Sequence, residues 1–279
     1  MIANPHFTKL PKPFWACVRY ISQQGGYTDR TTGGVKHFDS QTIHAVLQPF
    51  ELPHQQPSGA GQRIDRLLEE YFHYRADLLN SKVRPLLMDI EEARTLYQQL
   101  YNQLQPKCPI PKNKQRGDKA GPAYLTGIVN MLIEANAGSL PVDYNPLKLA
   151  TVSSGASLQH TFSRRFDGCF PNTINPIALW EIKEYYYTTT FGSRVADGIF
   201  ETLLDGFELE EARSASQQHI QHLLIIDSRF TWWACGRSYL CRLIDMLHMG
   251  FVDEILFGRE VVQSLPRIVL EWVASYNSR

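Results

Sequence analysis

The feature that most constrains the fold is an apolar run that leads directly into two opposite charges. Ile177–Trp180 is followed by Glu181, Ile182 and Lys183. Side chains of a β-strand alternate between its two faces, so Glu181 and Lys183 share one face and Ile182 lies on the other. Burying such groups without partners costs several kcal/mol each. The strand therefore lies either at an exposed edge or at a site that uses both charges.

The pattern after residue 120 predicts a mixed α/β domain. Helical and extended segments alternate along it, which is typical of a sheet with helices on both faces. The expected elements are a helix over Ala123–Ala137, extended segments at Leu158–Phe166 and Ile177–Tyr186, a helix from Ser193 to about Leu204, a strand at His222–Asp227, a helix over Cys235–Met249, a strand at Val252–Phe257 and a closing helix to about Tyr276.

Residues 1–105 are expected to form an α-helical N-terminal domain. Helical spacing is found at Trp15–Gln24, at Ser40–Leu47 with Ser40 as N-cap, and along Arg63–Leu104, interrupted at Arg84-Pro85. The segment 106–120 is rich in proline and lysine and is interpreted as a basic linker. Residues 121–279 then form the sheet domain.

Composition favours a globular protein and excludes some alternatives. Of the 279 residues, 43% are hydrophobic and 20% are charged, so the chain can bury a core. No apolar run approaches the length of about 20 residues that a membrane helix needs, and the N-terminus has no signal-peptide core. The five cysteines form no CxxC pair, which argues against a disulfide scaffold or a zinc knuckle. We expect a cytoplasmic protein with no membrane partner.

A second acid lies upstream of the charged strand. Asp167 precedes Glu181 by 14 positions, where an extended segment meets a turn. Carboxylates on neighbouring strands are suitable ligands for Mg²⁺, and the backbone carbonyl of Ile182 could add another. Lys183 could then orient the attacking water or stabilise charge on a phosphate. These residues predict phosphodiester hydrolysis, with Mn²⁺ as a substitute ion.

Asp167 followed by Glu181-Ile182-Lys183 resembles the active-site signature of the PD-(D/E)XK nuclease superfamily, over about residues 121–260. Phe166 stands where the motif often has proline. The resemblance implies a restriction-endonuclease-like core of order α-β-β-β-α-β, with the acids on the second and third strands. Many members also carry a glutamate on the helix before the first strand, a place that Glu134 matches.

The implied activity is that of a Mg²⁺-dependent DNA endonuclease, of restriction or anti-phage defence type. Asp167, Glu181, Lys183 and Glu134 are the expected catalytic residues, and Asp167, Glu181, Ile182 and Glu134 the expected metal ligands. Restriction enzymes cut both strands as dimers, so the resemblance also implies a homodimer and partner subunits of a defence system.

Duplex DNA is the expected partner, although the net charge is zero. Residues 1–120 carry 16 Lys and Arg against 11 Asp and Glu, and residues 121–279 carry 12 against 17. Any basic surface is therefore local. Candidate phosphate contacts are Arg164, Arg165, Arg194, Lys112, Lys114 and Arg116. The lysine-rich segment could equally be a solvated tether.

Two other interpretations stay open. One is a catalytically inactive nucleic-acid-binding or sensor subunit of a defence complex with the same fold. The other is a non-nuclease interaction protein in which the Glu181–Lys183 pair is structural. Considered by themselves, Glu181 and Lys183 could also be solvent-facing residues of an edge strand that form a surface ion pair, worth under about 1 kcal/mol.

Overall fold

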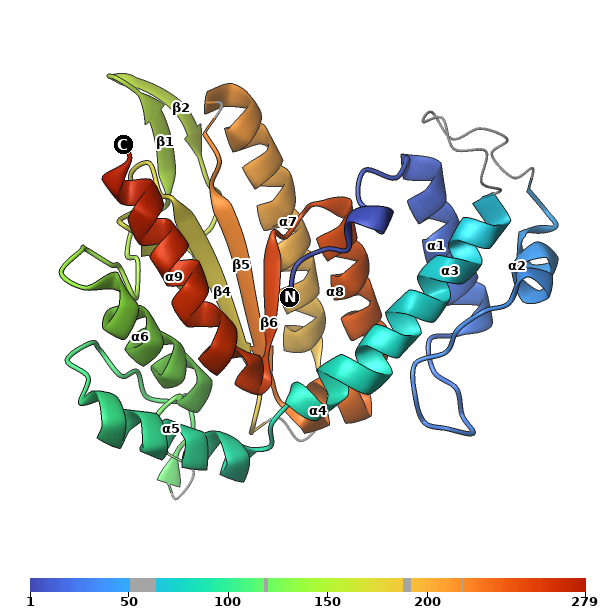
Figure 1. The fold of residues 1–279 in the computed structure, drawn as a ribbon, viewed down its shortest axis with the longest axis horizontal. Coiled ribbons are helices and arrows are strands. Elements are labelled where there is room, and N and C mark those ends of the chain that lie inside the picture. Colours follow the sequence, from blue (N-terminus) through green and yellow to red (C-terminus); the bar gives the residue numbers. More distant parts are fainter. Residues whose placement is uncertain (51–63, 118–119, 188–191, 217) are drawn as a thin grey trace.

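A mixed four-stranded sheet lies between two layers of helices in the computed structural model (Figure 1). The structure describes residues 1–50, 64–117, 120–187, 192–216 and 218–279. Helices α6 (Tyr124–Ala137) and α9 (Val261–Asn277) cover one face of the sheet. Helices α7 (Ser193–Ser216) and α8 (Arg237–Met249) cover the other. The prediction of a mixed sheet with helices on both faces is confirmed.

The strand order is β3-β4-β5-β6, with bounds β3 (Gly168–Phe170), β4 (Ala178–Glu184), β5 (Gln221–Asp227) and β6 (Glu254–Phe257). β3 runs antiparallel to β4, whereas β4, β5 and β6 are parallel. Parallel neighbours need a crossover connection, and α7 and α8 supply the two crossovers. β4 is therefore an inner strand, bonded on both sides.

Alternation along β4 divides its side chains between the two helical layers. Trp180 packs into the core under α6 and α9, where its ring stacks on Trp272 at a centroid distance of 5.5 Å. Leu179 faces the opposite way, into a cluster with Leu209 of α7. Glu181 and Lys183 share the face of Leu179, so both charges lie under α7.

The hairpin before β3 differs from expectation. β1 (Thr151–Ser154) and β2 (Ser157–Thr161) pair with each other in a separate two-stranded sheet. The resemblance allowed residues 142–166 to contain the first strand of the core and its hairpin. The hairpin is present as β1 and β2, but next to β3 this region contributes an isolated bridge between Asp143 and Cys169 rather than a strand. The extended segment also ends at Thr161 rather than Phe166, because residues 162–167 form a connecting loop.

The predicted N-terminal helices are present. They are α1 (Lys12–Gly25), α2 (Ser40–Leu47), α3 (Ile64–Asp77), a π-helical turn (Leu78–Val83), α4 (Arg84–Leu86) and α5 (Ile90–Leu104). The cap of α2 is Asp39 rather than Ser40, because the Asp39 carboxylate accepts the hydrogen bond from the Thr42 backbone N–H. No helix in the described part of the chain combines the length and apolarity needed to cross a bilayer.

Helix α5 belongs to the core beneath the sheet, although its sequence lies before the lysine-rich segment. Tyr97 of α5 packs against α6 beside Gly127. A Cβ at Gly127 would lie 2.7 Å from the Tyr97 ring, so the glycine permits this close approach. The helices on either side of the segment 106–120, α5 and α6, thus pack against each other.

A buried charge network fixes the N-terminal helices to α8. The Arg75 guanidinium of α3 is fully buried and donates from Nη1 to both carboxylate oxygens of Asp245, at 2.9 and 3.0 Å. The Tyr71 hydroxyl donates to Asp245 Oδ1 at 2.6 Å, and Arg75 Nη2 donates to the Ser22 hydroxyl at 3.0 Å. A fully buried guanidinium depends on such partners for its solvation.

Asp245→Ala is therefore expected to lower the free energy of unfolding by about 3–5 kcal/mol, since it leaves the Arg75 charge buried and unpaired. The measurement is chemical denaturation followed by circular dichroism. The matched control is Glu91→Ala, which removes the solvent-exposed pair with Arg94 and should cost less than about 1 kcal/mol. Equal losses in the two variants would contradict the role given to this network.

Candidate functional site

Pairing of β3 with β4 places Asp167 beside Glu181. Gly168 pairs with Trp180, so the preceding residue lies opposite Glu181. The backbone N of Asp167 donates to the Trp180 carbonyl at 3.1 Å. The Asp167 Oδ2 in turn accepts a hydrogen bond of 2.8 Å from the backbone N of Ile182. The structure therefore brings together the two acids on which the sequence prediction depends.

Gly168 makes this pairing possible. A Cβ at this position would lie 2.0 Å from Cζ2 and 2.5 Å from Nε1 of the buried Trp180 ring. Real Cβ atoms do not approach so closely, and the ring is held by its stacking on Trp272. The glycine after Asp167 is thus required by packing, rather than by the turn that the sequence suggested.

Glu181 and Lys183 form a buried ion pair. Glu181 is 1% exposed and Lys183 is 8% exposed, and Lys183 Nζ donates to Glu181 Oε2 at 2.9 Å. The edge-strand alternative is wrong for these residues, because β4 is bonded to β3 and β5 and its charged face is covered by α7. Glu181 and Lys183 are thus buried, and the hydrogen bond between them compensates for part of the cost of removing both charges from water.

Helix α7 adds two acids that sequence reasoning missed. Lys183 Nζ also donates to Glu201 Oε2 at 2.6 Å, and Asp205 is fully buried at the same place. Glu201, Asp205 and Glu208 follow one another at four- and three-residue spacing, which places them on one face of the helix. That acidic stripe was the available signal, and the predicted end of the helix near Leu204 concealed it.

Arg164 lies at the centre of the acids rather than at the surface. Its Nη1 donates to Glu181 Oε1 at 2.9 Å and to Asp205 Oδ2 at 2.8 Å, and its Nη2 lies 3.5 Å from Glu201 Oε2. Ser163, the preceding residue, donates its backbone N–H to the Glu208 carboxylate. We call Arg164, Asp167, Glu181, Lys183, Glu201 and Asp205 the charge cluster.

Electrostatics in the charge cluster are set first by burial and then by the neighbouring charges. Desolvation and the nearby Glu181 charge raise the pKa of Asp167 to about 6, although that residue as a whole remains open to solvent. Burial raises the pKa of Asp205 to about 7, against the opposing effect of Arg164. Burial opposes ionisation of Glu181 as well, but Lys183 and Arg164 outweigh it and its pKa is lowered. The Glu181 carboxylate and its two basic partners remain charged at neutral pH.

The oxygen donors of the charge cluster are of the kind that a hard divalent cation prefers. The buried Asp205 Oδ1 accepts no hydrogen bond within the described part of the chain, so one carboxylate oxygen has unused capacity. As the side chains stand, however, no three His, Cys, Asp or Glu residues among those described are arranged to hold a metal ion. The donor chemistry fits a metal, while Arg164 and Lys183 occupy the oxygens of Glu181.

Glu134 lies away from the charge cluster. It is on α6, which covers the opposite face of the sheet. Its Oε2 accepts a hydrogen bond of 3.0 Å from the backbone N of Lys107, and its charge contributes to the raised pKa of Cys108, which burial mainly causes. The structure therefore does not bring Glu134 to Asp167 and Glu181, because the helix that carries it packs on the wrong side of β4.

The predicted phosphate contacts are dispersed. Arg165 is exposed next to Arg164. Lys112, Lys114 and Arg116 are exposed in the segment that packs beside α6 through a hydrogen bond from Asn130 to the Pro109 carbonyl. Arg194 lies in the first turn of α7, and its side chain is outside the described residues.

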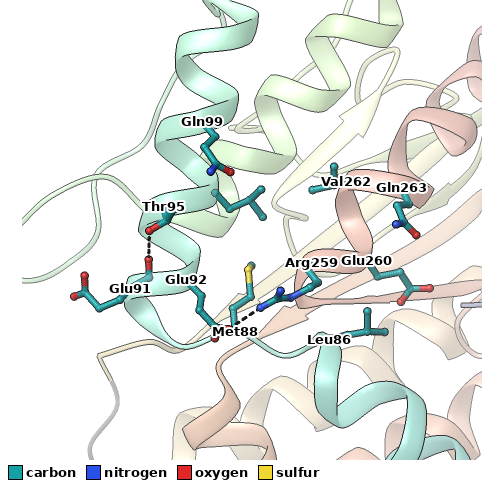
Figure 2. A pocket seen from close by; sticks show the side chains of 11 residues that line it. Leu86, Met88, Glu91, Glu92, Thr95, Gln99, Arg259, Glu260, Val262 and Gln263 are labelled. Atoms are coloured by element: carbon teal, nitrogen blue, oxygen red, sulfur yellow. Dashed lines mark hydrogen bonds and ion pairs between the residues drawn. The ribbon is translucent and has the colours of Figure 1, made fainter.

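A surface groove is lined by residues outside the charge cluster. Figure 2 shows it between the start of α5 and the start of α9, with Arg259 reaching toward Glu92. Their Nη2 and Oε1 atoms are 2.7 Å apart. The groove has a volume of about 560 Å³ and shares no residue with the charge cluster.

Comparison with protein families groups the sheet and the charge cluster in one unit. The model of a domain of unknown function, DUF7687, matches residues 88–272, about two thirds of the chain. The chain belongs to the DUF7687 family. Residues 1–82 match a second domain of unknown function, DUF7690. No curated protein and no solved structure matches the chain.

The DUF7687 region contains every member of the charge cluster and also contains α5. We predicted a division of the chain at 106–120, whereas the two family matches leave a gap between Lys82 and Met88. The packing of α5 on α6 gives the physical reason for including that helix with the sheet.

Asp227, at the end of β5, is a buried acid outside the charge cluster. Its Oδ1 accepts hydrogen bonds of 2.8 Å from the backbone N–H groups of Met88 and Ser228, and its Oδ2 accepts one of 2.5 Å from the Tyr186 hydroxyl. Burial raises the pKa of Asp227 to about 7, against the effect of these donors. The residue joins the sheet to the start of α5.

Asp227→Asn is expected to become relatively more favourable as the pH rises. The unfolded carboxyl ionises near pH 4, about three units below the folded one, so the wild type loses stability from this residue between about pH 4 and 7. Urea denaturation of both proteins at several pH values measures the trend. Asp39→Asn is the control, because a hydrogen bond with Thr42 lowers the pKa of Asp39 and its trend should be reversed. A pH-independent difference for Asp227→Asn would contradict the assignment.

Proposed function

We propose that the chain is a metal-dependent DNA endonuclease that hydrolyses phosphodiester bonds at the charge cluster. The observation that carries this proposal is the pairing of β3 with β4, which sets Asp167 opposite Glu181 with Lys183 on the same face of β4. Two carboxylates and an ammonium on one face are what the resemblance to PD-(D/E)XK nucleases requires.

The order of elements supports a restriction-endonuclease-like core. Helix α6 is followed by the β1–β2 hairpin, β3, β4, α7 and β5, which is similar to the order α-β-β-β-α-β. Asp167 immediately precedes β3 and Glu181 lies within β4, on adjacent strands. The hairpin departs from the family pattern because it forms its own sheet.

In this proposal Asp167 and Glu181 hold a Mg²⁺ or Mn²⁺ ion, with the Ile182 carbonyl as a further ligand. The ion would supply Lewis acidity and a lowered pKa of bound water. Lys183 remains charged and would place its ammonium next to the scissile phosphate, where it orients water and stabilises developing negative charge. We expect substrate to approach from the side of Asp167, which is an exposed residue. Glu134 has no part in this arrangement.

Duplex DNA is the proposed substrate, with contacts to the phosphates from exposed basic side chains. Arg165 lies next to the charge cluster in sequence and points to solvent, which suits a phosphate contact. Acidic residues of α7 would repel a polyanion, so the proposal requires the cation and these arginines to offset them. A homodimer and defence-system partner subunits remain part of the proposal by analogy only.

One observation favours the inactive alternative, a nucleic-acid-binding or sensor subunit with the same fold. Both carboxylate oxygens of Glu181 are bonded, one to Arg164 and the other to Lys183. A protein that never binds metal could retain this closed arrangement for stability. Cleavage that depends on Mg²⁺ distinguishes the two functions.

Asp167→Asn is the sharpest test, because the residue is exposed and asparagine can still accept the hydrogen bond from Ile182. Wild type and variant are incubated with plasmid, single-stranded DNA and RNA in Mg²⁺, Mn²⁺ or EDTA. We expect Mg²⁺-dependent cleavage of DNA by the wild type, and a rate lower by about 100-fold or more in the variant. The thermal midpoint should stay within a few degrees of wild type.

Glu210→Gln is the matched control, since it removes an exposed acid of α7 that is outside the charge cluster and should cleave as the wild type does. Absence of any metal-dependent cleavage by the wild type would overturn the proposed activity. So would cleavage at an equal rate by Asp167→Asn.

A further inference from the structure

We propose that Asp205 is a third carboxylate of the cation site and that the Arg164 guanidinium holds the place of the ion until the ion binds. This inference rests on the proposed function, because it assumes that the charge cluster takes up a divalent cation. It assigns roles to two residues that the PD-(D/E)XK resemblance does not give them.

The first observation is the unused capacity of Asp205. The residue is 0% exposed, yet its Oδ1 accepts no hydrogen bond from the described residues. Its other oxygen, Oδ2, bonds to the same Arg164 Nη1 that bonds to Glu181. The two carboxylates therefore converge on one positively charged nitrogen, and Asp205 retains a free oxygen for a cation. A buried carboxylate oxygen without a hydrogen-bond donor or a cation next to it is costly to maintain.

The second observation is the place of Arg164 in the fold. It lies in the loop of residues 162–167 between β2 and β3, and its side chain is 22% exposed. Lys183, by contrast, belongs to an inner strand and its side chain is 9% exposed. Arg164 is therefore the base that we expect to move aside, because it lies on a loop and is the more exposed of the two, whereas Lys183 lies on an inner strand beneath α7.

Charge explains why the exchange is favourable. Asp167, Glu181, Glu201 and Asp205 provide four carboxyl groups, which a bound divalent cation favours in their ionised form. Arg164 and Lys183 provide two positive charges. Replacing a guanidinium of charge one by an ion of charge two neutralises more of the negative charge. The ion also needs oxygen ligands, and Asp205 Oδ1 can serve as one of them.

The exchange also gives Arg164 its second role. Once displaced, the guanidinium lies next to the exposed Arg165 on the same loop, and the two arginines can bind substrate phosphate. Metal uptake and preparation of a phosphate site are then one event. The proposal thereby accounts for both the position of Arg164 among the acids and its predicted contact with phosphate.

Calorimetric titration of Mn²⁺ into the full chain, without nucleic acid, tests this inference. Arg164→Gln should bind Mn²⁺ about tenfold more tightly than the wild type, because the ion no longer displaces a guanidinium bonded to two buried carboxylates. Asp205→Asn should bind at least about tenfold more weakly, since it replaces a charged ligand by a neutral one. Arg165→Gln, which removes the neighbouring exposed charge, should leave Mn²⁺ affinity unchanged.

Removing Arg164 also destabilises the metal-free chain, so a second variant and a second readout are included. Arg164→Lys keeps a positive charge without the planar fork and should give an intermediate affinity. The thermal midpoint of Arg164→Gln should fall without metal, and Mn²⁺ should raise it more than it raises that of the wild type. Unchanged or weaker Mn²⁺ affinity in both Arg164 variants would overturn the inference, as would unchanged affinity in Asp205→Asn.

The outcomes separate this inference from the proposed function. If Arg164→Gln binds Mn²⁺ more tightly but the wild type cleaves no nucleic acid, the nuclease proposal is contradicted and the cation site is supported. If the wild type shows metal-dependent cleavage but the Arg164 variants bind Mn²⁺ with unchanged affinity, the role given to Arg164 is contradicted and the nuclease proposal is supported.

Discussion

The candidate site depends on the antiparallel pairing of β3 with β4. β3 contains only Gly168–Phe170, yet its register with β4 is what places Asp167 against Glu181. Gly168 permits that register by leaving room for the buried Trp180 ring. The ring in turn is part of the core under α6 and α9. Packing on one face of the sheet therefore fixes the positions of the acids on the other face.

Burial of Glu181 determines which side chains contact it on the face of β4 that α7 covers. An ionised carboxylate that is almost wholly removed from water needs charged partners, and Lys183 and Arg164 provide them. Those two bases are themselves held by acids of α7, which explains why this helix carries Glu201 and Asp205 toward the sheet. The bonds that compensate for this burial use both carboxylate oxygens of Glu181, which in the proposed function would also hold the cation.

Much of this arrangement could be predicted from local sequence. The alternation of Trp180, Glu181, Ile182 and Lys183 correctly gave the two faces of β4, and hydrophobic spacing located most helices. Contacts between distant segments could not be obtained in this way. Glu134 matched a family position along the chain, but α6 packs on the face opposite to the charge cluster. The spacing of Glu201, Asp205 and Glu208 indicated a shared helix face. That this face meets Arg164 depends on how α7 packs against the loop before β3, which no local pattern encodes.

The domain organisation shows the same limit. Prolines and lysines around residue 112 suggested a linker, yet the helices on either side pack together through Tyr97 and Gly127. Composition reports that a segment is irregular, whereas a boundary depends on whether the flanking elements share a core. The buried Arg75–Asp245 pair shows that the N-terminal helices, too, are fixed to the rest of the chain.

The most direct measurement of the central claim is a crystal structure of the wild-type protein grown with Mn²⁺, with anomalous scattering used to locate the ion. We predict one strong anomalous peak bounded by Asp167, Glu181 and Asp205, with the Arg164 side chain turned away from Glu181. A structure with no manganese at these carboxylates, and with Arg164 still bonded to Glu181 and Asp205 at saturating Mn²⁺, would contradict the account.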